Sequence, residues 1–230
     1  MDREDIMNNQ LYKQIKHHQH EGYETDIILS QRHTLRGFKV NEDVLRPEKM
    51  TSIWLARWLF FNNMIFIDKI VLDLGCGSGI QGVVMALYGA KRVLFSDKSE
   101  VAFGNTKENV EKFGIAGISE IFCGDLLEKI FKDSDVGLIV FNHPFFSDPD
   151  ENAPKSMVDR QGLIHRFFEE SRSKFPLASI IMPFYHRAGH INDPSQQALK
   201  HGYNVIERLR LDVRTGLQKG LISIYEVRLA

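Results

Sequence analysis

The sequence feature that most constrains the fold is a run of alternate glycines directly after a short apolar segment. Residues 70–74 read Ile-Val-Leu-Asp-Leu, and Gly75, Gly77 and Gly79 follow at every second position. An almost continuous apolar run of this length is typical of a strand buried on both faces of a sheet. Glycines after such a strand let backbone amides approach a ligand closely, with the amino end of the next helix behind them. The sequence therefore predicts a strand, a ligand-binding loop and a helix in succession.

This alternation of strands and helices continues to the C-terminus. Apolar runs predict further strands at residues 92–96, 119–122, 136–141 and 178–183, and helical patterns predict helices beginning near Met50 and at 83–88, 99–113, 126–132, 161–173 and 194–201. Pro, Asp and Asn in residues 145–160 favour a loop, and the chain closes with two extended stretches, 203–212 and 220–229. Strands alternating with helices imply a parallel sheet with helices on both faces. We expect an α/β fold with a Rossmann-like, doubly wound, seven-stranded sheet, mostly parallel and ending in an antiparallel edge hairpin.

The N-terminal segment has a different character. Residues 1–40 are polar and irregular, which predicts an N-terminal helical arm and divides the chain into a substrate-side extension, 1–45, and a single catalytic domain, 46–230. His17, His18 and His20 invite interpretation as a metal site, but no Cys or carboxylate lies at ligand spacing. A solvated helix is the simpler interpretation, and no metal is expected. After Met50, residues such as Trp54, Leu55, Trp58, Leu59 and Phe61 form an apolar stripe that is expected to pack on the sheet.

Composition narrows the possible classes of protein. With 43% apolar and 26% charged residues, a globular chain is expected rather than a disordered one. Two cysteines, no secretory leader and no apolar run that could span a bilayer predict a soluble, cytoplasmic protein with no membrane partner. The 29 basic and 30 acidic residues exclude binding of nucleic acid through bulk charge alone. Residues 151–230 nevertheless carry twelve basic and eight acidic residues, which is either ordinary variation or a basic face for RNA or an acidic protein.

Two classes of cofactor use a glycine loop of this kind. The dinucleotide motif GxGxxG requires a glycine where this chain has Ile80, which disfavours a nicotinamide-dependent oxidoreductase. The string Val-Leu-Asp-Leu-Gly-Cys-Gly-Ser-Gly instead resembles the first motif of class I S-adenosylmethionine-dependent methyltransferases of the methyltransferase small domain type. The resemblance implies S-adenosyl-L-methionine as cofactor. It implies these cofactor-binding residues: Thr51, Asp73, Gly75, Cys76, Gly77, Gly79, Asp97, Lys98, Asp125, Leu126 and Asn142.

Several of these residues have expected roles. Asp97 ends the second strand, where an acidic residue can accept hydrogen bonds from both ribose hydroxyls, although a strand-end aspartate can also cap the next helix. By the resemblance, Asp125 and Leu126 lie at the adenine, and Asp73 lies near the methionine end of the cofactor. Cys76 between the glycines is expected to be a small filler rather than a nucleophile.

Asn142-His143-Pro144-Phe145 follows the strand at 136–141 and resembles the (N/D/S)PP(Y/F/W) motif of methyltransferases that modify planar amino groups. Such nitrogens have delocalised lone pairs and are poor nucleophiles. Oxygens of the Asn side chain and the next backbone carbonyl can orient the amino group, and an aromatic ring can stack on it. Asn142, Pro144 and Phe145 are therefore the expected catalytic residues. His143 replaces the first proline, and either supplies only its carbonyl or acts as a general base; alternatively the whole motif is a strand-end turn with Phe145 in the core.

A segment before the core supports the same resemblance. Val44-Leu45-Arg46-Pro47, followed by Thr51, is similar to the segment that covers the cofactor in glutamine N5-methyltransferases and their RNA-modifying relatives, although Lys49 and Ser52 depart from that pattern. The expected function is N-methylation of a planar amino group on an RNA base or a protein glutamine. A small-molecule methyltransferase and a non-catalytic cofactor-binding subunit remain as alternatives, and the oligomeric state is left open.

Overall fold

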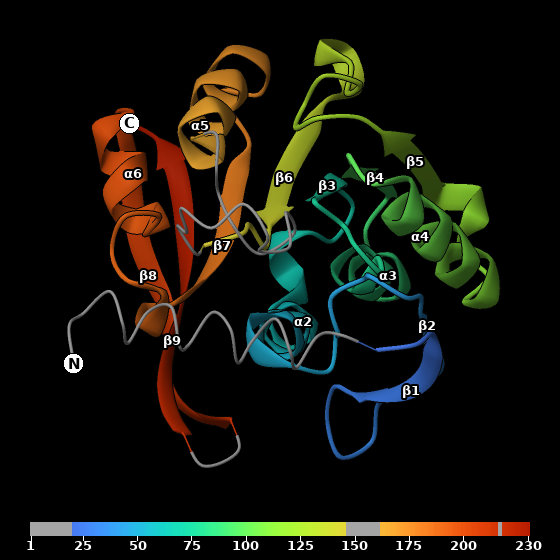
Figure 1. Ribbon diagram of the computed structural model, residues 1–230. Helices are drawn as coiled ribbons and strands as arrows, with labels where there is room; N and C mark the ends of the chain where they lie inside the picture. Colours follow the sequence, from blue (N-terminus) through green and yellow to red (C-terminus); the bar gives the residue numbers. More distant parts are fainter. Residues whose placement is uncertain (1–19, 146–161, 216–217) are drawn as a thin grey trace.

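The structure is a computed structural model that describes residues 20–145, 162–215 and 218–230 (Figure 1). Its main sheet contains seven strands: β3 (Ile70–Leu74), β4 (Arg92–Asp97), β5 (Ser119–Cys123), β6 (Val136–Phe141), β7 (Ser179–Tyr185), β8 (Tyr203–Thr215) and β9 (Gln218–Leu229). Their order across the sheet is β5-β4-β3-β6-β7-β9-β8. The first five strands in this order are parallel, and β9 is antiparallel to both β7 and β8. The predicted sheet and its antiparallel edge hairpin are confirmed.

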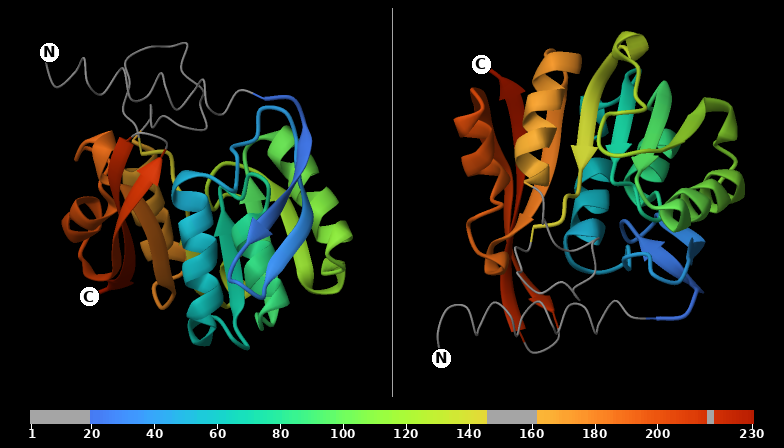
Figure 2. Two further views of the ribbon diagram at one scale, coloured as in Figure 1. Left: turned by 90° about the horizontal axis from the view of Figure 1, so that it is seen from below. Right: turned by 45° about the horizontal axis from the view of Figure 1, so that its top comes forward.

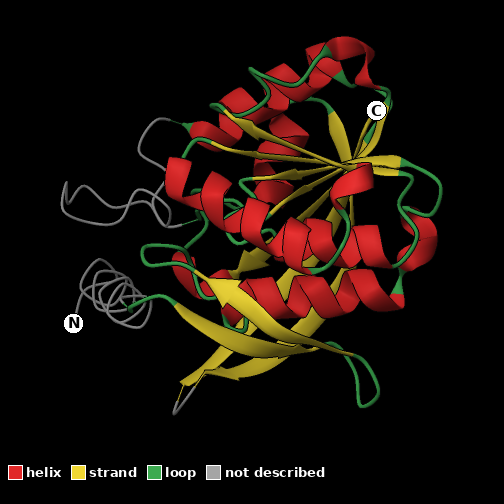
Figure 3. Ribbon diagram, turned by 90° about the vertical axis from the view of Figure 1, so that its right-hand side faces the viewer, coloured by secondary structure: helices red, strands yellow, loops and turns green. Residues whose placement is uncertain are grey.

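Helices cover both faces of this sheet (Figure 3). They are α2 (Met50–Phe61), α3 (Ile80–Leu87), α4 (Glu100–Lys112), α5 (Leu163–Lys174) and α6 (Pro194–Lys200). Short 3-10 turns occupy Asn63–Ile65, Ala116–Ile118, Lys132–Ser134 and His186–Ala188. One apolar core joins α2, α3 and α4 to the sheet, and a second joins α5 and α6 to it. Side chains that alternate along β3 illustrate the two layers, because Val71 belongs to the first core and Leu72 to the second.

The segment before α2 contains a separate two-stranded hairpin, β1 (Tyr23–Ile28) and β2 (Thr34–Val40). Figure 2 shows it beside α2 and α3, on the other side of the molecule from β8 and β9. Ile27 and Phe38 are fully buried in the same apolar core as α2 and α3. The first part of the predicted helical arm lies outside the described residues, and the described part is this hairpin rather than a helix. The division of the chain at residue 45 stays a prediction.

Local structure departs from the sequence-based expectations at several places. The helix expected at 126–132 is wrong, because residues 126–129 form turns and the short 3-10 helix begins only at Lys132. In the apolar stripe of α2, Leu55 and Leu59 are buried, but Trp54 and Trp58 are half-buried and Phe61 is 68% exposed. The loop expected at 145–160 lies almost wholly outside the described residues. Among the described residues, no helix has the length and apolar character needed to cross a membrane.

Candidate functional site

The predicted site residues gather where the parallel strands end. Strand order reverses between β3 and β6, because β4 and β5 lie on one side of β3 and β6 and β7 on the other. In open α/β sheets, ligands bind outside the carboxyl ends of the strands at such a switch point. The glycine loop follows β3, Asp97 ends β4 and Asn142 follows β6. The fold therefore brings the predicted loop, the strand-end acid and the acceptor motif to one edge of the sheet.

The glycine loop has a backbone that other residue types would adopt only with strain. Gly75, Gly77 and Gly79 have φ angles of 63°, 55° and 80°, in the left-handed region that favours glycine. The Gly75 and Cys76 N–H groups donate to the carbonyl of Ser96 on β4, at 2.7 and 3.1 Å. The loop is therefore tied to the neighbouring strand as well as to the one it follows.

Asp97 holds this loop through its side chain. Its Oδ2 accepts a hydrogen bond from Gly77 N–H at 3.0 Å, and its Oδ1 accepts one from Ser99 N–H at 2.9 Å. Burial raises the pKa of the carboxyl group, and these two hydrogen bonds act in the opposite direction. An ionised carboxylate has about four acceptor sites, so each oxygen retains capacity for one further donor. Ser99 rather than Asp97 caps α4, because the Ser99 hydroxyl accepts from Ala102 N–H, and the remaining acceptor sites of Asp97 are compatible with the expected ribose role.

Asp73 lies behind the loop rather than on its open side. It is 1% exposed, and its Oδ2 accepts a hydrogen bond from Gly82 N–H in the first turn of α3 at 2.8 Å. Burial raises the pKa of this carboxyl group well above its ordinary value. Asp73 therefore fixes the start of α3 against β3.

Gly82 is a residue that the sequence interpretation missed. A Cβ atom at this position would lie 2.0 Å from Cε1 of Phe95 on β4. The third glycine of the dinucleotide motif serves close packing of helix on strand. Here Gly82, two positions after Ile80, permits that close packing of α3 on β4.

Cys76 is a buried filler, as expected. Its Sγ lies 3.2 Å from Thr106 Oγ1, and the Thr106 hydroxyl donates to the carbonyl of Gly77 at 3.0 Å. Burial, reinforced by Asp97 and Asp73, raises the pKa of the thiol well above its ordinary value. A buried, protonated thiol is a poor nucleophile.

Two further residues of α4, Asn105 and Asn109, were also missed by the sequence interpretation. Asn109 accepts a hydrogen bond from Lys39 N–H at 2.9 Å and donates to the carbonyls of Lys39 and Ser78 at 2.8 and 2.9 Å. Asn105 accepts a hydrogen bond from Asn41 N–H at 2.9 Å. Both amides are fully buried, so they dock strand β2 and the glycine loop on one helix.

Asn142, the first residue of the acceptor motif, is held by the start of α2. Its Oδ1 accepts a hydrogen bond from the Thr51 hydroxyl at 2.9 Å, and its Nδ2 donates to Ser52 Oγ at 2.8 Å. These two bonds fix the orientation of the amide, while one oxygen lone pair and one N–H remain available. Thr51 and Asn142, both predicted for the site, are thus in direct contact, and Ser52 is an additional partner.

The other residues of the acceptor motif are partly or fully buried. His143 is 2% exposed, and its Nε2 donates to the carbonyl of Asn192 at 3.0 Å. Nδ1, the ring nitrogen that keeps a lone pair in this tautomer, is buried too, and burial of both nitrogens disfavours a role as general base. Phe145 is half-buried, with its ring 5.8 Å from that of His143 and 6.1 Å from that of Phe184. Pro144 between them is also half-buried.

The remaining predicted cofactor residues follow β4 and β5. Asp125 forms an ion pair with Arg166 of α5, with 2.8 Å between Nη1 and Oδ2. Leu126 is buried and has a φ of 46°, and Lys98 next to Asp97 is exposed. Arg166 was not predicted, because the pair joins residues 41 positions apart.

The segment before α2 lies against the glycine loop. A Cβ atom at Gly77 would be 3.8 Å from Val44 Cγ1. His20 Nε2 donates to the carbonyl of Val44 at 2.9 Å, and the Tyr23 hydroxyl donates to the Glu48 carboxylate at 3.0 Å. The hairpin therefore holds the segment that was expected to cover the cofactor.

Comparisons with known proteins agree with this architecture. Ribosomal protein L11 methyltransferase of Desulforamulus reducens is 43% identical over 72 residues, which are 31% of this chain and 23% of that protein. The Acinetobacter baumannii (strain AYE) protein of the same name is 39% identical over 75 residues, 33% of this chain and 25% of the relative. The match therefore spans about a quarter of the length of these curated relatives.

Solved structures share the fold at lower identity. The ribosomal protein L11 methylase of Lactobacillus delbrueckii subsp. bulgaricus superposes with a TM-score of 0.60 at 18% identity, covering 88% of this chain and 98% of that one. A candidate RNA methyltransferase of Pyrococcus horikoshii gives a TM-score of 0.56 at 22% identity, covering 77% and 83%. Precorrin-6y C5,15-methyltransferase of Geobacter metallireducens GS-15 gives 0.55 at 13%, covering 79% and 90%.

A profile of the methyltransferase small domain family matches residues 55–174, more than half of the chain. The matched range begins in α2 and ends with α5, and it contains the glycine loop, Asp97 and Asn142. The chain therefore belongs to the methyltransferase small domain family.

Proposed function

We propose that this chain transfers a methyl group from S-adenosyl-L-methionine to a planar amino nitrogen of a macromolecule, either an RNA base or a protein amide. The observation that carries the proposal is the position of Asn142. It lies at the carboxyl end of β6, with its amide oriented by Thr51 and Ser52. Family membership supports the reaction class, and Asn142 supports the type of acceptor.

The residues after β3 and β4 fit the proposed cofactor. Each oxygen of Asp97 accepts one backbone N–H and keeps room for a hydroxyl, which suits the two ribose hydroxyl groups. The positive φ of Gly77 and the absence of a side chain there leave the backbone open to a close ligand. When bound, S-adenosyl-L-methionine supplies an electrophilic methyl group on a sulfonium.

The acceptor side of the site orients a weak nucleophile. The second lone pair of Asn142 Oδ1 would accept an N–H of the planar amino group and so restrict its rotation. Phe145 follows Asn142 by three residues and is only half-buried, so the accessible part of its ring would stack on the flat acceptor. Because the His143 ring is almost fully buried, the proton lost by the acceptor nitrogen would pass to water.

The choice of a macromolecule rests on the relatives and on charge. The curated relatives are named for a ribosomal protein, and one structural neighbour is a candidate RNA methyltransferase. The edge strands β8 and β9 carry exposed Arg208, Arg210 and Arg228, which outnumber the two glutamates that they pair with, because Arg208 and Arg228 share one. Both cysteines are free, which agrees with a reaction in the reducing cytoplasm.

A labelling experiment with a matched control tests the proposal. Tritiated S-adenosyl-L-methionine is incubated with the protein and with ribosomal RNA and ribosomal protein from cells that lack it, and incorporation is assigned by RNase and protease digestion. We expect Asn142→Ala to lose about a hundredfold in methyl transfer, as misorientation of reactants does. Asn204→Ala, an exposed residue of β8, should match the wild type.

The outcomes separate the competing functions. RNase-sensitive label supports a base acceptor, and protease-sensitive label supports a protein amide. Calorimetric binding of S-adenosyl-L-methionine without label in either fraction would favour a small-molecule acceptor or a non-catalytic subunit. No binding of the cofactor would refute the proposal, and equal label with wild type and Asn142→Ala would remove Asn142 from its role.

A further inference from the structure

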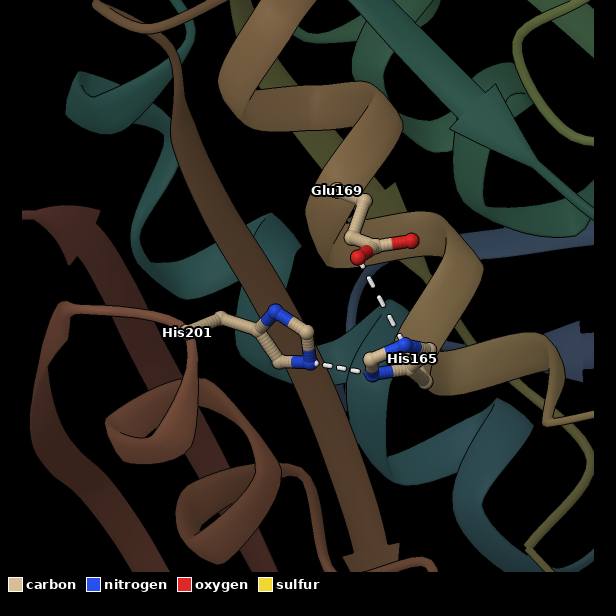
Figure 4. A group of neighbouring side chains, drawn as sticks. All are labelled: His165, Glu169 and His201. Atoms are coloured by element: carbon tan, nitrogen blue, oxygen red, sulfur yellow. Dashed lines mark hydrogen bonds and ion pairs between the residues drawn. The ribbon is translucent and has the colours of Figure 1, made fainter.

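Two helices on the face opposite the α2–α3 layer bring together three side chains that can ligate a metal ion. His165 and Glu169 belong to α5, and His201 ends α6 (Figure 4). His165 Nδ1 lies 2.7 Å from His201 Nε2, and His165 Nε2 lies 3.5 Å from Glu169 Oε1. One ligand atom from each residue can be chosen so that all three lie within 4.8 Å of one another. Nothing in the function proposed above uses this cluster.

Helix geometry and packing contacts position these three side chains. His165 and Glu169 are four residues apart on α5, so they lie on one face of the helix, one turn apart. The His201 ring stacks on Phe168, with 5.8 Å between centroids and 26° between planes. The Tyr203 hydroxyl donates to the carbonyl of Phe168 at 3.2 Å, which ties the start of β8 to α5. The cluster therefore joins two packed elements, although its outer side is exposed.

The donor set suits a cation of intermediate softness. Imidazole nitrogens favour zinc, copper, iron and nickel, and a carboxylate oxygen completes the ligand set commonly found for zinc. Zinc–nitrogen bonds of about 2.0 Å in a tetrahedron place neighbouring ligand atoms about 3.3 Å apart. The two imidazoles would separate by about half an ångström from their present hydrogen bond. One ion can use only one nitrogen of His165, so a ligand atom that now lies up to 4.8 Å from the others must also move closer. Because His165 and Glu169 are exposed, their side chains have room to rotate in this way.

The composition of the cluster also favours a cation. Glu169 contributes a carboxylate whose charge a divalent cation would offset. The ion would replace the hydrogen bond between the two imidazoles, and the ring that donates this bond would carry its proton on its other nitrogen instead.

We propose that His165, Glu169 and His201 form a binding site for one Zn²⁺ ion, with water as the fourth ligand. The ion would join α5 to α6. Since α5 also carries Arg166, which pairs with Asp125, the ion would stabilise the helix that contacts the end of β5. The sequence did not predict the site because His201 is 36 residues from His165 in the chain.

A zinc titration of the whole 230-residue chain tests this site. The background is a chain with His17 and His18 changed to Gln, so that zinc held by these neighbouring histidines does not enter the count. Zinc chloride alone is titrated against a chromogenic chelator, and bound zinc is counted by mass spectrometry of the metal. We expect one ion per chain. His201→Gln and Glu169→Gln should weaken binding by about tenfold or more, because even loss of groups that only support a ligand does so. His190→Gln, an exposed histidine just before α6, should leave binding unchanged.

A second readout excludes an effect on folding. Each variant should show the same circular dichroism spectrum and melting temperature as its parent in the presence of EDTA. Cobalt(II) substituted into the parent should give the intense visible absorption of tetrahedral coordination, and His165→Gln should abolish it. No zinc bound by the parent would overturn the proposal. Equal affinity in parent, His201→Gln and Glu169→Gln would overturn it too, as would an octahedral cobalt spectrum.

Discussion

Replacing Gly82 with alanine tests the closest approach between a helix and a strand in this fold. Gly82 lies in the first turn of α3 and faces Phe95 on β4. An added Cβ would be 2.0 Å from Cε1, 2.6 Å from Cζ and 2.8 Å from Cδ1 of the ring. Phe95 is fully buried, so the ring cannot move into solvent. Either the ring or α3 must shift by more than an ångström to restore ordinary van der Waals contact.

Two opposing effects determine how much Gly82→Ala changes the free energy of unfolding. Alanine is favoured over glycine in a helix by about 1 kcal/mol. Overpacking of a close-packed core costs about 1–3 kcal/mol, and the full burial of Phe95 puts this site at the upper end. The free energy of unfolding should therefore fall by about 2 kcal/mol, which lowers the melting temperature of a chain of this size by about 4–8 °C. A shifted α3 would also move the Gly82 N–H away from Asp73 and so loosen the glycine loop.

Gly104 provides the matched control. It lies within α4, and a Cβ there would have nothing within 4 Å. Gly104→Ala should gain only the helix propensity, about 1 kcal/mol, and melt a few degrees higher. Urea denaturation and thermal melts of both variants measure the difference. A Phe95→Leu change should recover part of the loss in Gly82→Ala. If Gly82→Ala is as stable as Gly104→Ala, the close packing of α3 on β4 is wrong.

Three further predictions concern the buried polar groups around the site. Asn109→Ala should lower the free energy of unfolding, measured by urea denaturation, by about 2–3 kcal/mol, because backbone groups of β2 and the glycine loop lose their partners. Relative to the wild type, amide exchange in this variant should become faster in β2 and stay unchanged in β7. The contribution of Asp73 to stability should decrease as the pH rises from 3.8, the ordinary carboxyl pKa, through its raised folded-state pKa, since the folded state then binds more protons than the unfolded state. The free energy of unfolding of the wild type relative to Asp73→Asn should therefore fall over this pH range in urea denaturation, and a difference that does not change with pH would contradict the assignment. Iodoacetamide at pH 7 should label exposed Cys123 and leave buried Cys76 unmodified in peptide mass spectra, and equal labelling would refute the raised thiol pKa.

The sequence predicts the main sheet well because its central strands are buried on both faces. A run such as Val136–Phe141 needs no alternation to be identified, since both its faces contact apolar helices. The glycine loop is also predicted from the sequence, because each of its three left-handed backbone positions requires a glycine, and glycine is identified directly in the sequence. The hairpin β1–β2 leaves a weaker record. Glu24 and Asp26 are exposed and alternate with partly or fully buried neighbours, which is a short period-two pattern, and a bulge between Thr25 and Ile27 shifts the register of the pair.

The polar contacts that organise the site depend on distances that no local pattern contains. Asn105 and Asn109 fit the pattern of a solvated helix face, yet both form hydrogen bonds with the backbone of Lys39 in β2, more than 60 residues away. An Asn side chain can form hydrogen bonds with both the N–H and the C=O groups of a neighbouring strand, because its amide contains a donor and an acceptor. The sequence does not show this role, since it depends on where the strand lies relative to the helix. One amide of Asn109 contacts both Lys39 and Ser78, so strand β2 and the glycine loop share a support. The described part of the predicted substrate-side extension, which contains β2, is for this reason a structural part of the candidate cofactor site.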